Sequence, residues 1–433
     1  MELRSIEERS RLAHLPRPEL ARYQLSRLAD LFKAMLPANA LYAEKYADLP
    51  LPPRSLEELA ALPYTFKEEL LEPRHEGRLA NNQTWPLERY VRYHQTSGTR
   101  GRPLAIVDSG DDWQWWLDCW QYVLDAAEIA PGDRVLMAFS FGPFIGFWSA
   151  HDALIHRGCL VVPGGGMNSA GRLDLARRTG ANVLFCTPSY ALHLAEVALE
   201  HKIDAAGLGI ERIVLAGEPG GSVPATRARI AALWQAEVYD HAGASEVGPW
   251  GIPAARGAGL YVNEADFLCE FLSVETGRAA AEGELAELVI TTLGRVGCPV
   301  IRYRTGDLVR PHWRHEGVPQ FVFLAGGVVG RVDDMVIVRG VNIFPTAIEH
   351  IVRSFPEVIE YRATVSLHQG LDELSIEVED RLAEPARVAA ELQLRLGLRV
   401  EVHCAALGSL PRFEGKGRRF VDSRAGASRE ATS

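Results

Sequence analysis

The chain lacks the features that mark a secreted, membrane-spanning or metal-stapled protein. Its six cysteines are scattered over 433 residues without a Cys-x-x-Cys pair, which argues against a disulfide framework and against a zinc ribbon. No stretch reaches the ~18 uninterrupted apolar residues that a membrane-spanning helix needs. The N-terminal segment is charged throughout and contains no apolar run of the kind found in a signal peptide. We therefore expect a cytoplasmic protein with no membrane partner.

An excess of positive charge is also missing. The formal net charge is -10 at pH 7, so no extended basic surface for nucleic-acid phosphates is implied, and nucleic acid is not expected as a partner. Apolar residues make up 47% and charged residues 24% of the chain, which are ordinary proportions for a globular protein. At roughly 100–200 residues per domain, a chain of this length forms two to four folding units.

The pattern of apolar and polar residues divides the chain into segments of different character. Residues 1–85 are helical and charged, with proline-rich breaks, and predict a helical layer. In residues 86–257, strand-like runs such as RVLMAF and RIVLAG alternate with helix-like runs, which predicts an α/β core with a layered sheet. Residues 258–332 hold short β-rich pieces, and residues 333–422 combine strand and helix patterns into a small α+β unit. Residues 423–433 predict a disordered tail.

A candidate phosphate-binding loop follows the strand-like run VRYHQ. The segment Thr96 to Pro103, TSGTRGRP, gathers hydroxyls and glycines, a composition that lets backbone N–H groups surround phosphate oxygens. The Gly-Lys-Ser/Thr ending of a Walker motif is absent, so kinases and P-loop ATPases lose their main support. Taken alone, such a segment is more often an ordinary turn.

Two acidic residues follow strand-like runs further along the chain. Glu246 ends the sequence Gly-Ala-Ser-Glu after EVYDHA, where its carboxylate could hold a magnesium ion that bridges nucleotide phosphates. Asp307 ends the sequence Tyr-Arg-Thr-Gly-Asp, where it can accept hydrogen bonds from ribose hydroxyls. Each is also compatible with an ordinary loop carboxylate.

In this order and spacing, the three segments resemble those of the adenylate-forming superfamily. The long run GRVDDMVIVRGVNIFP at residues 330–345 makes the match specific, and Glu349 and the sequence FEGKGRR at residues 413–419 extend it. Over nearly its whole length the chain resembles the phenylacetate–coenzyme A ligases, one branch of that superfamily. The resemblance implies an α/β fold with a large N-terminal adenylation domain (residues 1–332) and a small mobile C-terminal domain (residues 333–422).

The resemblance also implies a reaction and its cofactors. An aryl or arylacetic carboxylic acid would react with ATP and Mg²⁺ to give an acyl adenylate and pyrophosphate, and the acyl group would then pass to coenzyme A. Some relatives carry a Cys/His zinc site after the glutamate that corresponds to Glu246. Residues 247–260 contain neither residue type, so we expect no structural zinc. Relatives in this family often form dimers, so the resemblance also suggests a homodimer.

For the nucleotide, the resemblance assigns a role to each matching residue. The phosphate loop, with Thr96, Ser97, Gly98, Thr99 and Gly101, would wrap the β- and γ-phosphates while Glu246 ligates magnesium. Asp307 would hold the ribose, and Arg331 would reach the ribose or the phosphates. The adenine side would be lined by Gly217, Glu218 and Pro219, and Ala242, Gly243 and Ser245 would also belong to the ATP site. Many relatives stack an aromatic ring on adenine at the position of Ala242, so Tyr239 or His241 is expected to substitute.

Lys416 is the residue that the resemblance singles out for adenylation. It would contact both the substrate carboxylate and the α-phosphate, where negative charge spreads as the carboxylate attacks phosphorus. An isolated Gly-Lys-Gly would instead indicate a solvated lysine in a tail. After adenylation the C-terminal domain would turn about Asp333 and bring Arg339, Gly340 and Asn342 toward the site for attack by the thiol.

The acyl group is expected to bind near a cluster of aromatic residues interrupted by glycine and proline. Core packing is an equally good account of these aromatic side chains. The predicted pocket consists of Phe139, Phe141, Phe144, Gly146 and Ala216.

Two other functions stay open at this point. A freestanding adenylating enzyme would make the same acyl adenylate and load a carrier protein or an amine. A non-catalytic nucleotide-binding protein is disfavoured, because Glu246, Asp307 and Lys416 are all present where charge would develop.

Overall fold

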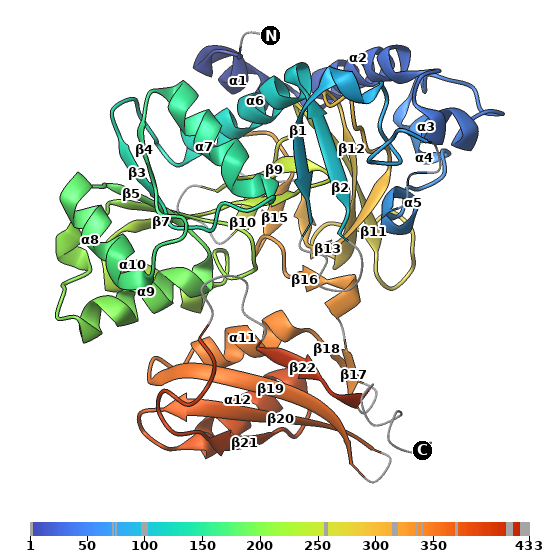
Figure 1. The fold of residues 1–433 in the computed structure, drawn as a ribbon. Coiled ribbons are helices and arrows are strands. Elements are labelled where there is room, and N and C mark those ends of the chain that lie inside the picture. The colour runs from blue at the N-terminus through green and yellow to red at the C-terminus, as the bar shows by residue number, and fades with distance from the viewer. Residues whose placement is uncertain are drawn as a thin grey trace.

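The computed structural model describes residues 3–71, 73, 76–96, 103–254, 259–313, 319–334, 336–338, 341–368, 371–412 and 419–424 (Figure 1). Among these residues, no helix combines the length and the apolar character needed to cross a bilayer.

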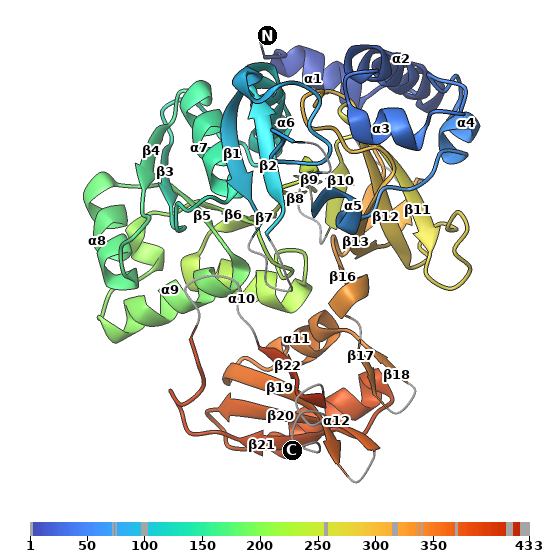
Figure 2. The ribbon, with the colours of Figure 1, turned by 45° about the vertical axis from the view of Figure 1, so that its right-hand side comes forward.

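Helices form the N-terminal part of the chain: the first two lie across the top of the molecule in Figures 1 and 2, and the shorter ones that follow lie along one side. Side chains of Ser5, Asn39 and Ser55 accept hydrogen bonds from backbone N–H groups at three of the helix starts, which satisfies donors that the helix itself leaves unpaired. The helices are α1 (Ile6–Ala13), α2 (Arg17–Met35), α3 (Ala40–Lys45), α4 (Leu56–Ala60) and α5 (Lys67–Leu71).

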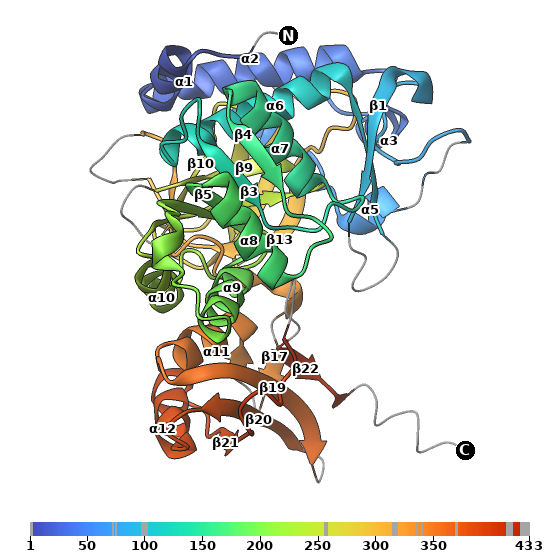
Figure 3. The same cartoon turned by 60° about the vertical axis from the view of Figure 1, so that its left-hand side comes forward.

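A five-stranded parallel sheet forms the centre of the larger unit, with the strand order β4-β3-β5-β6-β7. Its strands are β3 (Arg134–Met137), β4 (Leu160–Pro163), β5 (Val183–Cys186), β6 (Arg212–Leu215) and β7 (Glu237–Asp240). Parallel strands need crossover connections, and helices α6 and α7 cover one face of the sheet while α8, α9 and α10 cover the other (Figures 1 and 3). These helices are α6 (Gly110–Ala126), α7 (Ile145–Arg157), α8 (Ser169–Thr179), α9 (Pro188–Glu200) and α10 (Pro224–Trp234). The arrangement confirms the predicted α/β class.

Antiparallel strands complete the larger unit. One sheet has the order β14-β15-β10-β9-β8, built from β8 (Ala242–Ala244), β9 (Gly248–Pro253), β10 (Gly259–Val262), β14 (Pro311–His312) and β15 (Phe323–Ala325). The other has the order β11-β12-β13-β16, built from β11 (Phe267–Ser273), β12 (Ala286–Thr292), β13 (Tyr303–Val309) and β16 (Gly330–Arg331). The antiparallel part begins at Ala242, earlier than the β-rich segment 258–332 that the sequence pattern indicates. β9 is buried at every position, so it carries no alternation that would reveal a strand.

The C-terminal unit has a sheet of its own, with the order β21-β20-β19-β22 (Figures 1 and 3). Its core is a separate hydrophobic cluster that includes Val338, Ile348, Ile376 and Leu392. A short 3-10 helix, η3 (Val332–Asp334), precedes it. Its elements are β17 (Val336–Val338), β18 (Val341–Ile343), α11 (Pro345–Arg353), β19 (Val358–His368), β20 (Leu371–Asp380), α12 (Pro385–Leu396), β21 (Glu401–Cys404) and β22 (Phe420–Asp422).

A buried ion pair joins three parts of the larger unit. The hairpin of β1 (Tyr90–Gln95) and β2 (Ala105–Ser109) carries Asp108, whose Oδ1 lies 2.7 Å from Nε of Arg295. Both side chains are completely buried. The guanidinium group also donates to the backbone carbonyl of Glu246 at 2.9 Å, and it lies over the ring of Trp116. Arg295 therefore joins the hairpin whose two strands flank the candidate phosphate loop in sequence to the turn that carries Glu246.

Removing Arg295 should destabilise the fold strongly. We expect Arg295→Met to lower the free energy of unfolding by about 3–5 kcal/mol, because the carboxylate of Asp108 would stay buried without its partner. Urea unfolding followed by circular dichroism measures this change. Arg178→Ala is the matched control: it removes an exposed ion pair with Asp174 on α8 and should cost less than about 1 kcal/mol. Equal losses in the two variants would contradict the prediction.

Candidate functional site

The loops that follow the parallel strands meet at one edge of the sheet. Carboxyl ends of parallel strands all point to the same edge, and ligands of open α/β sheets bind in the crevice outside it. The strand order places the loops of β3 and β6 on either side of the loop of β5. These loops contribute Phe139 and Phe141 after β3, Gly164 to Gly166 after β4, Thr187 after β5, Ala216 to Pro219 after β6 and His241 after β7.

The predicted acyl pocket residues have different surroundings. Phe139 is 4% exposed and its ring packs on Phe147, as the core-packing account requires. Phe141 is half-buried, with its ring 4.9 Å from that of Trp148, and Phe144 is 38% exposed. Of this aromatic set, Phe141 and Phe144 are therefore the rings with surface left for a ligand.

Gly146 and Ala216 of the predicted pocket also differ in how exposed they are. Gly146 lies in the first turn of α7, and a methyl group placed on its Cα would meet no atom within 4 Å. Ala216 is half-buried, and its backbone N–H donates to the carbonyl of Cys186 at 3.1 Å. The geometry thus leaves room beside Gly146.

A backbone hydrogen bond joins the loop after β3, which carries Phe139 and Phe141, to the end of the strand that leads into the candidate phosphate loop. The N–H of Gln95, at the end of β1, donates to the carbonyl of Pro143 at 2.7 Å. The next residue, Thr96, closes the base of the phosphate loop: its N–H donates to the Leu104 carbonyl and its Oγ1 accepts from the Leu104 N–H, both at 3.0 Å. Residues Ser97, Gly98, Thr99 and Gly101 lie outside the described residues.

Glu246 lies in the turn between β8 and β9 and is held at two points. Its backbone carbonyl accepts from Arg295, and its side-chain Oε1 accepts from the hydroxyl of Tyr303 at 2.8 Å. Tyr303 belongs to β13 and is 1% exposed. Burial, together with the neighbouring carboxylate of Glu246, raises the pKa of Tyr303 well above its ordinary value, so the hydroxyl stays protonated and donates. Sequence reasoning did not find this role of Tyr303, because a buried tyrosine on a strand is ordinarily a core residue.

Asp307 and Arg331 are cross-strand neighbours. They are register partners in the pairing of β13 with β16, and Nη1 of Arg331 lies 2.7 Å from Oδ1 of Asp307. Nη2 of Arg331 donates to the carbonyl of Thr305 at 3.1 Å. The charges of Asp307 and Arg331 also act on Tyr303. The two residues expected at the ribose therefore lie together, in one cluster with Tyr303 and Glu246.

The other residues expected at the nucleotide come from two separate segments, the loop after β6 and the strand β8 with the turn that follows it. Gly217 is exposed, with a backbone φ of +93°, and Oε1 of Glu218 accepts from the N–H of Ser189 at 2.8 Å. Pro219 next to them is half-buried. In β8, Ala242 pairs with Gly251, Gly243 is exposed and the following Ser245 is half-buried. These backbone positions leave Gly217 and Gly243 as open surface.

Neither ring that was expected to replace the missing adenine stack is turned toward open surface. The hydroxyl of Tyr239 donates to Glu237 on the same strand, and the ring is 5% exposed. The ring of His241 lies 4.3 Å from that of Trp120, and its Nδ1 is 2.7 Å from the Gly251 carbonyl. Burial lowers the pKa of His241 to about 4. These contacts do not support a stacking role for either ring in this arrangement.

The residues expected to act from the C-terminal unit are described only in part. Asp333 lies in η3, between β16 and β17, and the backbone of Asn342 lies in β18. Arg339, Gly340 and Lys416 lie outside the described residues, as do the side chains of Asp333 and Asn342.

The carboxylate of Glu246 fits a magnesium ion. Oε1 is held by Tyr303, and Oε2 accepts no hydrogen bond from any described residue. Half-buried carboxylate oxygens of this kind are the hard ligands that Mg²⁺ prefers, and Mg²⁺ commonly takes only one or two of them together with substrate phosphates. Among the described residues there is no group of three or more His, Cys, Asp or Glu side chains that could hold a metal ion.

Comparisons with known proteins agree over most of the chain. A family profile described as "AMP-binding enzyme C-terminal domain" matches residues 340–424. Phenylacetate–coenzyme A ligase of Pseudomonas putida is 30% identical over 423 residues, which cover 94% of each chain. The enzyme of the same name from Escherichia coli strain K12 is 31% identical over 94% of this chain and 95% of its own length.

Solved structures show the same fold. 2-Hydroxyisobutyryl-CoA ligase in the postadenylation state, in complex with 2-HIB-AMP, superposes with a TM-score of 0.89 at 26% identity, covering 100% of this chain and 97% of the other. The same enzyme in the thioesterification state, with 2-HIB-AMP and CoA, superposes with a TM-score of 0.71 at equal coverage. By its sequence relatives, its C-terminal profile and its fold, the chain belongs to the phenylacetate–coenzyme A ligase family of adenylate-forming enzymes.

Proposed function

We propose that this protein joins an aryl or arylacetic acid to coenzyme A in two steps at one site. In the first, a carboxylate oxygen attacks the α-phosphorus of ATP, the bond to the β-phosphate oxygen breaks, and pyrophosphate leaves. In the second, the thiol of coenzyme A attacks the acyl carbonyl carbon of the adenylate, and AMP leaves. The observation that carries the proposal is the cluster of Glu246, Tyr303, Asp307 and Arg331, in which the groups expected at magnesium and at the ribose lie together.

Each group in this cluster has a distinct task in the proposed first step. Asp307 accepts hydrogen bonds from the ribose hydroxyls, and Arg331 keeps that carboxylate oriented while its own charge faces the polyphosphate. Glu246 supplies a carboxylate oxygen to Mg²⁺, with its rotamer held by the Tyr303 hydroxyl. When bound, Mg²⁺ neutralises charge on the phosphates. Thr96 anchors the loop whose backbone N–H groups bind the phosphate oxygens.

Lys416 completes the proposed machinery as the cation at the reacting centre. As the carboxylate attacks, negative charge grows on the oxygens around the α-phosphorus, and a nearby ammonium group stabilises that charge more than it stabilises the bound substrates. The proposed second step needs a turn of the C-terminal unit about Asp333, which would bring Arg339, Gly340 and Asn342 to the site.

Phe141, Phe144, Gly146 and Ala216 form the proposed acyl pocket. The two partly open rings and the space beside Gly146 suit a flat apolar group better than a small aliphatic acid. A carrier-protein thiol presents the same chemistry as coenzyme A, so turnover with coenzyme A alone separates the two acceptors. A homodimer and a cytoplasmic location stay predictions.

Replacing Lys416 should abolish most of the first step. We expect Lys416→Ala to slow acid-dependent ATP–pyrophosphate exchange by on the order of 10²–10³. The assay uses a panel of aryl, arylacetic and short hydroxy acids, with thioester then measured after addition of coenzyme A. Lys33→Ala, an exposed lysine on α2, is the control and should leave the rate unchanged. Exchange that survives in Lys416→Ala would remove this residue from the mechanism, and no exchange with any acid would oppose the proposed activity.

The hydroxyl of Tyr303 should matter for the metal. We expect Tyr303→Phe to raise the Mg²⁺ concentration needed for half-maximal exchange by about tenfold, because Glu246 would lose the bond that orients it. The KM for the acid should stay within about twofold. Tyr46→Phe is the matched control, since that buried hydroxyl donates to the carbonyl of Pro63 outside the site. An unchanged Mg²⁺ dependence would show that Tyr303 acts only in packing.

Filling the space beside Gly146 should affect the acid and leave ATP binding alone. We expect Gly146→Leu to raise the KM for the aromatic acid at least about tenfold, since binding would require displacing the new side chain. Gly110→Leu is the control: this glycine also lies in the first turn of a helix and faces open space. A rise in the KM for ATP instead of the acid would place Gly146 in the nucleotide site.

A further inference from the structure

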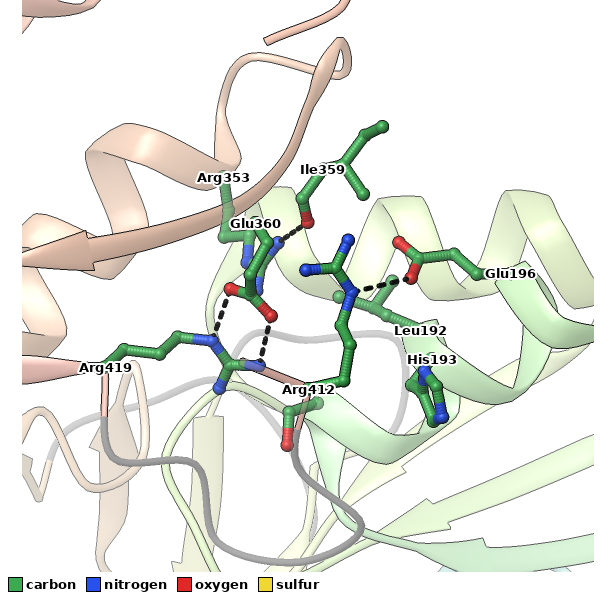
Figure 4. Close-up of a pocket in the computed structure, with 9 residues that line it drawn as sticks. Leu192, His193, Glu196, Arg353, Ile359, Glu360, Arg412 and Arg419 are labelled. Carbon is green, nitrogen blue, oxygen red and sulfur yellow. Dashed lines mark hydrogen bonds and ion pairs between the residues drawn. The ribbon is translucent and has the colours of Figure 1, made fainter. Parts of the chain in front are cut away.

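The interface between the two units is lined by charged side chains on both sides. A small cavity lies between α9 of the larger unit and the first strand of the C-terminal sheet (Figure 4). From α9, Glu196 points into this interface, and from the C-terminal unit Arg353, Glu360, Arg412 and Arg419 line the opposite wall. Contacts here join the C-terminal unit to the larger one.

Arg412 is held in a fixed orientation toward α9. Its Nη1 and Nη2 are 3.1 and 2.7 Å from the two carboxylate oxygens of Glu379, a side chain that is completely buried. Nη1 also donates to the carbonyl of Leu410. These bonds use the two terminal nitrogens and leave Nε facing Glu196, whose Oε2 lies 4.0 Å away across the interface (Figure 4). A bidentate pair of this kind fixes the plane of the guanidinium group.

A second contact crosses the same interface. Nη1 of Arg229, on α10, donates to the carbonyl of Val358 at 2.9 Å, at the start of β19. Burial raises the pKa of Glu196 and the charges of Arg412, Arg229 and Arg353 oppose that effect, whereas the charge of Glu360 adds to it. Two of those three arginines belong to the C-terminal unit. The carboxylate of Glu196 is therefore stabilised in part by Arg412 and Arg353, which face it only while the two units are docked in this way.

Arg412 and Arg419 also bound the segment that contains Lys416. Arg419 makes a two-bond pair with Glu360, at 2.7 and 3.0 Å, and Glu360 accepts a further bond from Arg353 at 3.3 Å. Both ends of the segment are thus anchored at the interface with α9. Docking Arg412 against Glu196 fixes one of these ends relative to the larger unit.

As a whole, the chain superposes better on one state of a comparison enzyme than on two others. The TM-scores are 0.89 and 0.86 against 2-hydroxyisobutyryl-CoA ligase in the postadenylation state, and 0.71 and 0.72 against the same enzyme in its thioesterification state and in an open conformation. The C-terminal unit makes up about a fifth of this chain. A different placement of that unit would separate Arg412 from Glu196 and Arg229 from Val358.

We propose that Glu196 and Arg229 are positioning residues for the first half-reaction: they hold the C-terminal unit against α9 and α10 while the acyl adenylate forms, and they have no part in thioester formation. This inference rests on the proposed two-step function. Polar contacts between the units suit this task, because charged pairs that are partly exposed are weak enough to break in each catalytic cycle. An apolar interface of similar size would hold the units together more strongly.

The kinetic test measures the two half-reactions separately. In the full-length enzyme, Glu196→Gln keeps the shape of the side chain and removes its charge. We expect ATP–pyrophosphate exchange to fall about three- to tenfold, while thioester formation from added acyl adenylate and coenzyme A is unchanged or faster. Arg229→Met should give the same split. The matched control is Glu200→Gln, an exposed position on the same helix. Equal loss in both half-reactions, or no loss in either, would overturn the proposal.

A second test needs no substrate and so distinguishes this inference from the proposed function. Cys404 in the C-terminal unit is exposed, whereas the other five cysteines are buried or half-buried. Pulsed electron paramagnetic resonance measures the distance between the units, with one spin label on Cys404 and the other on a cysteine introduced at the exposed Ile155 of α7. We expect Glu196→Gln to enlarge a second distance population relative to Glu200→Gln. Identical distance distributions in the two variants would overturn the positioning role of Glu196, whatever acid the enzyme uses. Absence of ATP–pyrophosphate exchange in the unmodified enzyme would count only against the proposed function.

Discussion

The buried pair of Arg295 with Asp108 is the interaction on which the candidate site depends. Neither side chain is exposed, and the pair reaches three separate pieces of the chain: the β1–β2 hairpin, the loop after β12 and the turn with Glu246. A charge in such a place is tolerated only while its partner is present, so the three pieces are held in one relative position. Strand β2 and the turn with the carboxylate proposed for magnesium are far apart in sequence, and this pair joins them.

The interior of each unit and the interface between the units are stabilised by different physical means. Each has its own hydrophobic cluster, with residues such as Trp115 and Phe185 in the larger unit and Ile348 and Ile376 in the smaller one. Burial of apolar surface stabilises each unit internally. Between the units, the contacts include an arginine–carboxylate pair and a hydrogen bond from an arginine to a backbone carbonyl. Such an interface permits relative motion without unfolding either unit, which a two-step reaction at a single site requires.

Sequence reasoning predicted the α/β class well, because strand-like runs and helix-like runs alternate clearly where each parallel strand needs a crossover helix. It failed at the start of the antiparallel part, where β9 is buried throughout and shows no alternation. It grouped Asp307 with Arg331, which are cross-strand partners. It did not find the role of Tyr303, since nothing in a strand pattern tells which hydroxyl will meet a carboxylate 57 residues away. Nor does the sequence indicate that the ring of His241 packs on Trp120, or that the hydroxyl of Tyr239 donates to Glu237 on the same strand.

The order of chemically specific segments was determined by the sequence alone: a Ser/Thr/Gly loop, the carboxylates of Glu246 and Asp307, the long run at residues 330–345 and a lysine near the C-terminus. Residue types and local periodicity carry this information, because backbone preference and side-chain chemistry are properties of short segments. The sequence pattern places Asp307 after a strand, whereas it lies within β13. Tertiary structure decided which of these groups meet and how they are held. Pairing of Asp108 with Arg295, of Tyr303 with Glu246 and of Arg412 with Glu379 depends on long-range packing, and the free energy of a buried charge is set by neighbours that are distant in the chain.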